Sequence, residues 1–154
     1  MSDHARAHLL FFDAALVVEK SSPDATSPNA VLVQVQLYSQ LVDWLILADE
    51  PMRAQYRAAE WLRLVPTDSE ALKQLRELAR QTSDYAHFAN ALVAASEALA
   101  DPDLRVRLLL EAAQAQQEHA TDPQAATDLY VRVLLDSAPG GGRGDYRDDE
   151  FGGT

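Results

Sequence analysis

The chain has 154 residues, enough for one domain with a sizeable core, and its 47% hydrophobic and 24% charged residues are typical of a globular protein rather than a disordered one. Its formal net charge of −11 disfavours general binding to nucleic acids or anionic membranes, because both surfaces repel an acidic chain. It has no cysteine, which excludes a disulfide framework, a thiolate nucleophile and cysteine-ligated zinc.

The N-terminal stretch MSDHARAHLLFFDAALVVEK has an apolar run like that of a secretory signal, but Asp13 interrupts it and no small-residue cleavage site follows. We therefore expect a helix over residues 3 to 20, ended by the loop SSPDATSP. No segment reaches the roughly 18 to 20 uninterrupted apolar residues of a membrane span. We expect a cytoplasmic protein with no membrane partner.

The residue pattern of the next segment is compatible with either a strand or a helix. VLVQVQL, from Val31 to Leu37, alternates apolar with polar residues and is rich in β-branched side chains, which favours a strand. The run from residue 29 to residue 48 continues with Leu41 and Leu45 at helical spacing. Because no other segment offers a strand partner, the sequence predicts a helix here.

The rest of the chain repeats one plan. Prolines recur every 36 to 38 residues, at Pro28, Pro66, Pro102 and Pro139, and apolar stripes of helical spacing lie between them. One such stripe runs through Tyr85, Phe88, Leu92, Ala95 and Leu99. Self-similarity at this period, with two helices in each unit, indicates a stack of antiparallel helical hairpins.

The segment from Ser83 to Pro139 resembles a tetratricopeptide-repeat array of the degenerate bacterial kind. The resemblance rests on Asp84-Tyr85 and Asp122-Pro123 at the turns inside the hairpins. It also rests on second-helix residues and closing prolines, namely Ala126, Tyr130, Val133, Leu134 and Pro139, with Ala54, Ala58, Trp61, Leu62 and Pro66 upstream. It covers about residues 29 to 139, although Arg76, Gln116 and Gln117 depart from the family's usual small or aromatic residues.

This resemblance implies an all-α fold: a right-handed α-solenoid of about three hairpins with an extra N-terminal helix. The hairpins would span about residues 29–65, 68–99 and 103–137, within a repeat domain of residues 1–139. The family binds protein segments on a concave surface built from first-helix residues. Here these would include Tyr38, Lys73, Glu77, Arg80, Glu111 and Glu118.

Spacing alone singles out one more feature of this surface. Lys73, Arg76 and Arg80 form a basic stripe at i, i+3 and i+7 in an acidic protein. Either Glu70 and Glu77 neutralise these charges through local helix pairs, or the stripe binds the carboxylates of a partner by charge-assisted hydrogen bonds. We therefore include Arg76 among the expected partner-binding residues.

No set of residues has the spacing of a catalytic or cofactor site. His4 and His8 would share a helix face, but no third metal ligand accompanies them, and no glycine-rich loop follows a strand. We expect no enzyme activity, no metal and no cofactor. The composition changes after Pro139. We expect residues 140–154, GGGRGDYRDDEFGGT, to be a disordered acidic tail.

The sequence thus predicts a non-catalytic adaptor or scaffold that binds a protein or peptide segment, with no nucleic-acid partner. The alternative is a structural subunit that self-associates or joins a larger complex through exposed apolar helix faces. Val35, Val42, Leu45 and Ile46 favour this alternative, since they would leave one side of their helix unusually apolar.

Overall fold

The computed structural model describes residues 2–119 and 122–137, and the predicted tail of residues 140–154 lies outside them. The described residues form seven helices and no strand, which confirms the expected all-α class. The helices are α1 (Asp3–Ser21), α2 (Pro28–Leu47), α3 (Pro51–Leu64), α4 (Ser69–Thr82), α5 (Tyr85–Glu97), α6 (Pro102–His119) and α7 (Pro123–Ser137).

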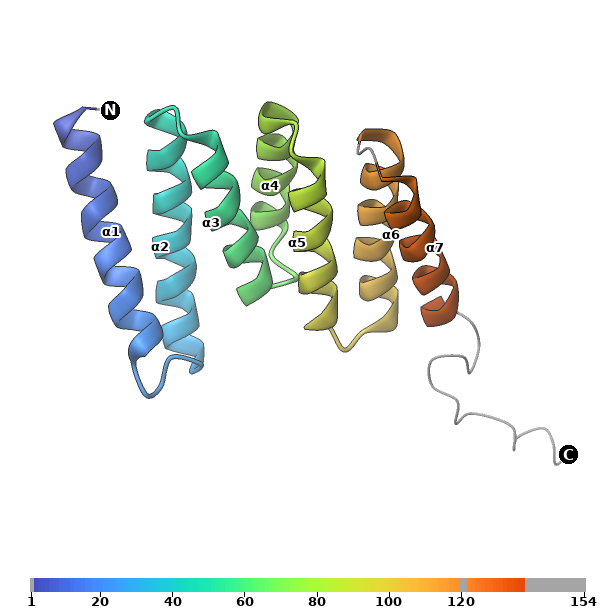
Figure 1. Cartoon of the computed structure of the whole chain (residues 1–154). Coiled ribbons are helices and arrows are strands. Elements are labelled where there is room, and N and C mark those ends of the chain that lie inside the picture. The colour runs from blue at the N-terminus through green and yellow to red at the C-terminus, as the bar shows by residue number, and fades with distance from the viewer. Residues whose placement is uncertain (1, 120–121, 138–154) are drawn as a thin grey trace, which may run out of the picture.

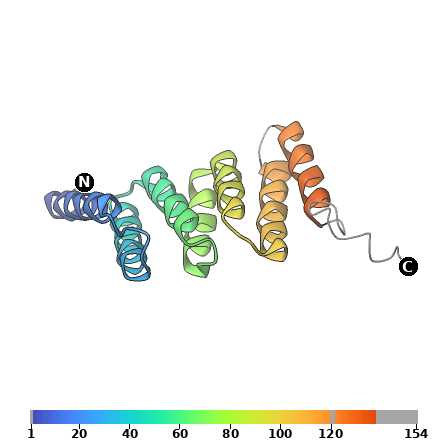
Figure 2. The same cartoon turned by 90° about the horizontal axis from the view of Figure 1, so that it is seen from below.

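The helices stand side by side in an elongated row, with α1 and α7 at opposite ends (Figure 1). Each helix contacts the next one along the chain, and the chain runs in opposite directions in neighbouring helices. Seen from below, α2, α4 and α6 lie on one side of the row, while α3, α5 and α7 lie on the other (Figure 2). This alternation explains why α3 also contacts α5.

The helix starts follow from local chemistry. The side chains of Ser2, Ser27, Asp68 and Asp84 each accept a hydrogen bond from a backbone N–H of the first turn, which satisfies a donor that has no partner inside the helix. Four helices, α2, α3, α6 and α7, begin with proline, whose missing N–H costs nothing at that position. The segment from Val31 to Leu37 is helical throughout, as predicted.

The core follows the predicted apolar stripes. Leu41, Leu62, Leu75, Leu78 and Leu92 are completely buried and belong to one continuous cluster that reaches from α1 to α6. Between α3 and α4, the buried indole of Trp61 donates a hydrogen bond from Nε1 to Oδ2 of Asp68 at 2.9 Å. Asp68 therefore both caps α4 and fixes α4 against α3.

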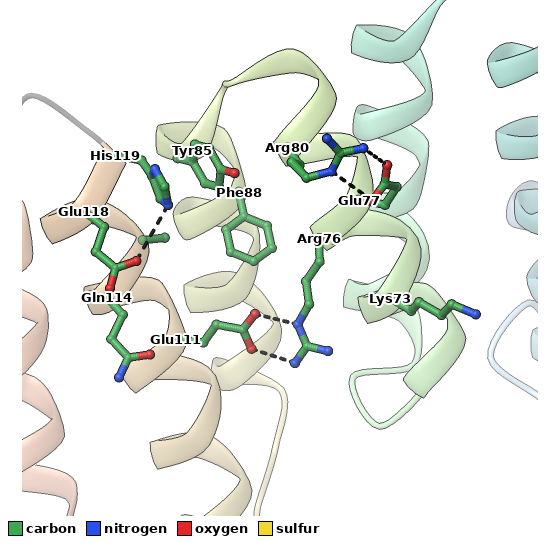
Figure 3. Close-up of a pocket in the computed structure, with 11 residues that line it drawn as sticks. Lys73, Arg76, Glu77, Arg80, Tyr85, Phe88, Glu111, Gln114, Glu118 and His119 are labelled. Carbon is green, nitrogen blue, oxygen red and sulfur yellow. Dashed lines mark hydrogen bonds and ion pairs between the residues drawn. The ribbon is translucent and has the colours of Figure 1, made fainter.

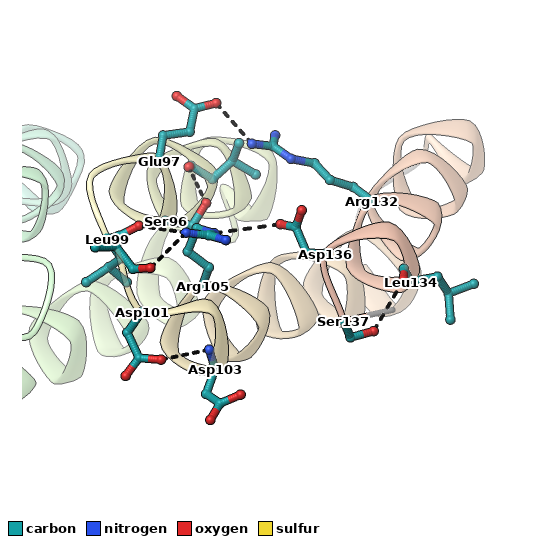
Figure 4. A network of polar contacts seen from close by, with 12 residues as sticks. Ser96, Glu97, Leu99, Asp101, Asp103, Arg105, Arg132, Leu134, Asp136 and Ser137 are labelled. Carbon is teal, nitrogen blue, oxygen red and sulfur yellow. Dashed lines mark hydrogen bonds and ion pairs between the residues drawn. The ribbon is translucent and has the colours of Figure 1, made fainter. Parts of the chain in front are cut away.

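Arg105, in the first turn of α6, connects this helix to the loop before it and to α7 (Figure 4). Its Nη1 donates hydrogen bonds to the carbonyl oxygens of Leu99 and Ala100, at 3.1 Å and 3.2 Å, in the loop before α6. Its Nε lies 3.9 Å from Oδ2 of Asp136 on α7. Polar contacts thus supplement the apolar packing where α7 joins the array.

Among the described helices, α2 has the length and apolar composition that would let it cross a membrane. Its most apolar 18-residue window is 33% buried, with Leu41, Val42 and Leu45 in the core. A core helix of a water-soluble protein meets the same two criteria.

Candidate interaction groove

A groove of about 550 Å³ lies between α4, α5 and α6 (Figure 3). It is lined by charged side chains from α4 and α6 and by aromatic side chains from α5. The lining residues are Lys73, Arg76, Glu77, Arg80, Tyr85, Phe88, Glu111, Gln114, Ala115, Glu118 and His119.

The apolar face of α4 determines where its charges lie. Leu75, Leu78 and Ala79 are completely buried against the neighbouring helices. Because side chains three and four residues apart share one helix face, burial of these residues leaves Arg76 and Arg80 on the solvent-facing side. The strong segregation of apolar and charged residues in α4 thus places the basic stripe beside the groove.

A bidentate ion pair crosses the groove from α4 to α6. Arg76 donates from Nε to Oε2 of Glu111 at 2.6 Å and from Nη2 to Oε1 at 2.8 Å. These bonds stabilise the charged guanidinium and raise the pKa of Arg76 above its usual value, against the smaller opposing effect of partial burial. The Glu111 side chain is only 26% exposed, whereas that of Arg76 is 53% exposed.

A second pair stays within α4. The guanidinium of Arg80 donates two hydrogen bonds to the carboxylate of Glu77, and Gln81 donates a third from Nε2 at 3.2 Å. These bonds, that of Arg80 first, lower the pKa of Glu77 to about 2. The stripe is therefore divided: Arg80 is neutralised locally, as one interpretation of the sequence holds, while Arg76 is neutralised across the groove.

The floor of the groove is apolar. Phe88 is 3% exposed and Ala115 is 7% exposed, so both present only a small patch of carbon to the groove. At one end, the ring of Tyr85 stacks on the ring of His119 with centroids 3.9 Å apart. Nε2 of His119 lies 3.7 Å from Oε1 of Glu118 at the rim. An apolar floor with charged walls suits a segment that carries both kinds of side chain.

The third member of the basic stripe differs from the other two. Among the ion pairs of the described residues, none includes Lys73. Its exposed side chain extends away from Arg76 and Glu111 at the edge of the groove (Figure 3). Of the three cations in the stripe, the ammonium group of Lys73 can therefore bind an anion without first breaking an ion pair.

The structure brings six of the seven expected partner-binding residues to this one groove: Lys73, Arg76, Glu77, Arg80, Glu111 and Glu118. It does not bring Tyr38 there. Tyr38 is 2% exposed on α2, and its hydroxyl accepts a hydrogen bond from Nζ of Lys20 at 3.0 Å. Tyr38 instead lines a separate hollow of about 340 Å³ with Lys20, Gln34, Glu60, Arg63 and Leu64.

The sequence interpretation leaves Gln114 and His119 out of the groove and assigns Tyr85 and Phe88 to packing alone. Phe88 does pack, but its ring edge also closes the groove floor. His119 carries a signal as an aromatic residue in the last turn of its helix, but its partner Tyr85 is 34 residues away in the sequence. Only the tertiary structure brings the two rings together.

Outside the groove, the described residues contain no group of three histidines, aspartates or glutamates arranged to hold a metal ion. His4 and His8 share a helix face, with ring centroids 4.4 Å apart. Their rings pack on Trp44 of α2, that of His8 stacked at 4.1 Å. This pair thus takes part in the contact between α1 and α2.

The apolar face expected to favour self-association is largely absent. Val42 is completely buried and Leu45 is 2% exposed, because α2 packs between α1 and α3. Of the four residues expected there, Ile46 is exposed, at 38%, and Val35 is half-buried. The most exposed apolar side chains lie instead on the two end helices, around the turn from α2 to α3, and at Leu32 near the start of α2.

Compared with family models, with curated proteins and with solved structures, the chain matches none of them.

Proposed function

We propose that this protein is a non-catalytic interaction module, an adaptor or scaffold, that binds a segment of another protein in the groove between α4, α5 and α6. The observation that carries the proposal is the convergence of charged residues from two helices, α4 and α6, over an apolar floor supplied mainly by α5. Such a surface provides area for apolar side chains and fixed charges for orientation.

The arrangement of the helices supports a tetratricopeptide-like array, a right-handed α-solenoid with α2/α3, α4/α5 and α6/α7 as its hairpins and α1 as the extra helix. In an array of this kind the first helices of the hairpins line the concave side. The groove lies between two such first helices, α4 and α6. The charge of −11 supports a protein partner rather than a nucleic acid or a membrane surface, and the proposed location is the cytoplasm.

The ion pairs suggest how a segment binds. An acidic residue of the partner approaches Lys73 first and then competes with Glu111 for the guanidinium of Arg76. Because the Arg76 side chain is half exposed, exchanging one carboxylate for another costs little free energy. An apolar side chain next to that acidic residue then covers Phe88 and Tyr85. The proposed ligand is therefore a short acidic segment that also carries an apolar anchor.

The experiment is a selection of peptides from a random displayed library, followed by measurement of the dissociation constant for each selected peptide. We expect acidic peptides with an aromatic or aliphatic residue, bound more weakly as salt increases. The double variant Arg76→Glu/Arg80→Glu should bind at least about tenfold more weakly, since each charge-assisted hydrogen bond contributes about 1.5 to 3 kcal/mol.

The matched control is Arg53→Glu/Arg63→Glu, which makes the same charge change at exposed positions of α3 outside the groove. Circular dichroism verifies that both variants fold. Equal binding by the groove variant, or equal losses in groove and control variants, contradicts a binding site between α4 and α6. Capture of proteins from the native host, with the groove variant as the comparison, then identifies the natural partner.

A further inference from the structure

Helix α1 is apolar on two opposite faces. Its inner face, with Ala5, Leu9 and Leu16 buried, packs on α2. Its outer face consists of exposed residues only: Ala7, Leu10, Phe11, Ala14, Val17 and Val18. The four large side chains of this outer face are 64%, 65%, 64% and 67% exposed, in chain order. A surface helix of a globular protein normally carries polar residues on that side.

The outer face lies at the open end of the row. In both views α1 is the terminal helix, with α2 on one side and no described element on the other (Figures 1 and 2). The face extends over more than three helical turns, since a turn takes about 3.6 residues. It is therefore long enough, and free enough, to pack along another helix.

The pattern of the outer face is self-complementary. Small residues recur every seventh position at Ala7, Ala14 and Ser21, and larger residues do so at Leu10 and Val17. This is the heptad repeat of a two-helix coiled coil. When two copies lie antiparallel, with a two-fold axis between residues 15 and 16, Ala14 of one copy faces Val17 of the other, and Leu10 faces Ser21. A small residue thus meets a large one at each layer.

The charges beside the outer face do not interrupt it. No charged residue lies on the face itself between Ala7 and Val18, and Asp13 and Lys20 lie seven residues apart along one edge. Both contact their own chain: Asp13 accepts a hydrogen bond from Arg57 of α3, and Lys20 donates one to Tyr38 of α2. The pairing of two outer faces therefore depends on their apolar side chains.

We propose that the outer face of α1 binds a second copy of this chain, as an antiparallel α1–α1 pair. Two copies of this face bury roughly 1,000 Å² of largely apolar surface, near the lower limit for a specific interface, so the dimer is a weak and reversible one. The dimer presents two interaction grooves, and a partner with two binding segments gains affinity from binding both. This inference does not depend on the groove's being a binding site.

Another occupant of the outer face would be α7 of a neighbouring copy, which would extend the row into a filament. Val131, Leu134 and Leu135 of α7 are 49%, 67% and 60% exposed. This patch spans little more than one turn, against more than three turns on α1, so it covers the α1 face poorly. The self-complementary pairing of α1 covers the outer face from Leu10 to Val18.

The first test measures molar mass by light scattering during size-exclusion chromatography, from low to high micromolar concentration. We expect a monomer–dimer equilibrium for the native chain and at least about tenfold weaker association for Val17→Glu, which places an uncompensated charge in the interface twice. Leu134→Glu, at a position equally exposed on α7, should associate like the native chain. Thermal melting shows that both variants remain folded, since both side chains are more than 60% exposed.

A native chain that stays monomeric at every concentration overturns the proposal. Assemblies that grow beyond a dimer and dissociate with Leu134→Glu overturn it in favour of the filament. Unchanged association of Val17→Glu overturns it as well.

The second test determines the orientation, and the absence of native cysteine makes single-cysteine variants clean probes. In the antiparallel register the two copies of residue 14 lie about 5 Å apart along the helix axis, and those of residue 7 about 25 Å apart. Ala14→Cys should therefore be joined into a dimer by a short bifunctional thiol reagent, and Ala7→Cys should not. Equal cross-linking at both positions indicates parallel helices and contradicts the proposed pair, as does no cross-linking at Ala14→Cys.

Discussion

The groove and the outer face of α1 are two exposed surfaces built on opposite principles. In the groove, the Arg76–Glu111 and Arg80–Glu77 pairs already satisfy four of the charged residues, and Phe88 and Ala115 of the floor are each less than 10% exposed. On α1, four large apolar side chains are exposed and no charge interrupts them. The first surface is stable in water without a ligand and suits a partner that comes and goes. The second gains free energy whenever it is covered.

The two regions also differ in their supporting contacts. Helix α5, which supplies the groove floor, contacts α3, α4 and α6, whereas α1 packs mainly on α2. In an array with mainly nearest-neighbour contacts, an end helix depends on a single interface and opens more readily than a central helix.

The largest expected effect comes from removing a buried leucine in each region. Leu92 on α5 is completely buried, and Leu16 on α1 is 2% exposed. We expect Leu92→Ala to lower the free energy of unfolding by about 3 to 5 kcal/mol and Leu16→Ala by about 2 to 3 kcal/mol, since the end helix can adjust to the cavity. Urea denaturation measures both values.

Hydrogen exchange sharpens this comparison. Leu16→Ala should speed exchange mainly in α1 and the facing side of α2, whereas Leu92→Ala should speed it from α3 to α7. An unchanged stability of Leu92→Ala, or an equally global effect of Leu16→Ala, contradicts the distinction between centre and end.

Two ion pairs allow a smaller-scale comparison by double-mutant cycles. Arg57 on α3 donates from Nη2 to Oδ1 of Asp13 on α1 at 2.8 Å, with the side chains 29% and 32% exposed. Burial lowers the pKa of Arg57, but its bonds to Glu60 and Asp13 outweigh burial and leave the pKa raised. The Arg76 side chain of the groove pair is more exposed, at 53%.

We expect coupling energies of about 1 kcal/mol for Arg57–Asp13 and about 0.5 kcal/mol for Arg76–Glu111, because solvent screens the more exposed pair. High salt should reduce the coupling energy of Arg76–Glu111 more than that of Arg57–Asp13. The cycles use alanine for the arginines and the matching amide for each acid, with unfolding followed by circular dichroism. A stronger and salt-resistant coupling energy for Arg76–Glu111 would indicate that this pair holds α4 and α6 rigidly together and does not exchange readily with a partner's carboxylate.

The smallest expected effect is the pH dependence contributed by Glu77. Its pKa falls from 4.5 to about 2 in the folded protein. A lowered pKa means that the ionised carboxylate stabilises the folded state above pH 4.5 and loses this contribution between pH 4.5 and pH 2. The stability difference between the native chain and Glu77→Gln should therefore shrink over that window. Because Glu77 is half exposed, the effect is small, and a difference independent of pH would contradict the assignment to the carboxylate.

The helical class, the positions where helices begin and end, and the identity of most groove residues can be predicted from the sequence. Asp68, Asp84 and the prolines act through bonds to their own neighbours, so their effect on chain direction is local. The apolar stripe through Phe88 and Leu92 points inward because it carries large apolar side chains at helical spacing. The same periodicity leaves Arg76 and Arg80 on the solvent side of α4.

Only the tertiary structure decides which exposed residues meet and which faces are covered. Periodicity assigns Tyr38 and Val42 to a helix face, but burial of that face depends on α1 folding back over α2. Likewise, the ion pair between Arg76 and Glu111 and the ring stacking of Tyr85 on His119 join residues about 35 positions apart. Helical spacing relates residues three and four apart, whereas contacts across helices depend on how whole helices pack. For the same reason, the sequence shows that α1 is apolar, and its place at the end of the row shows that no described residue covers one of its faces.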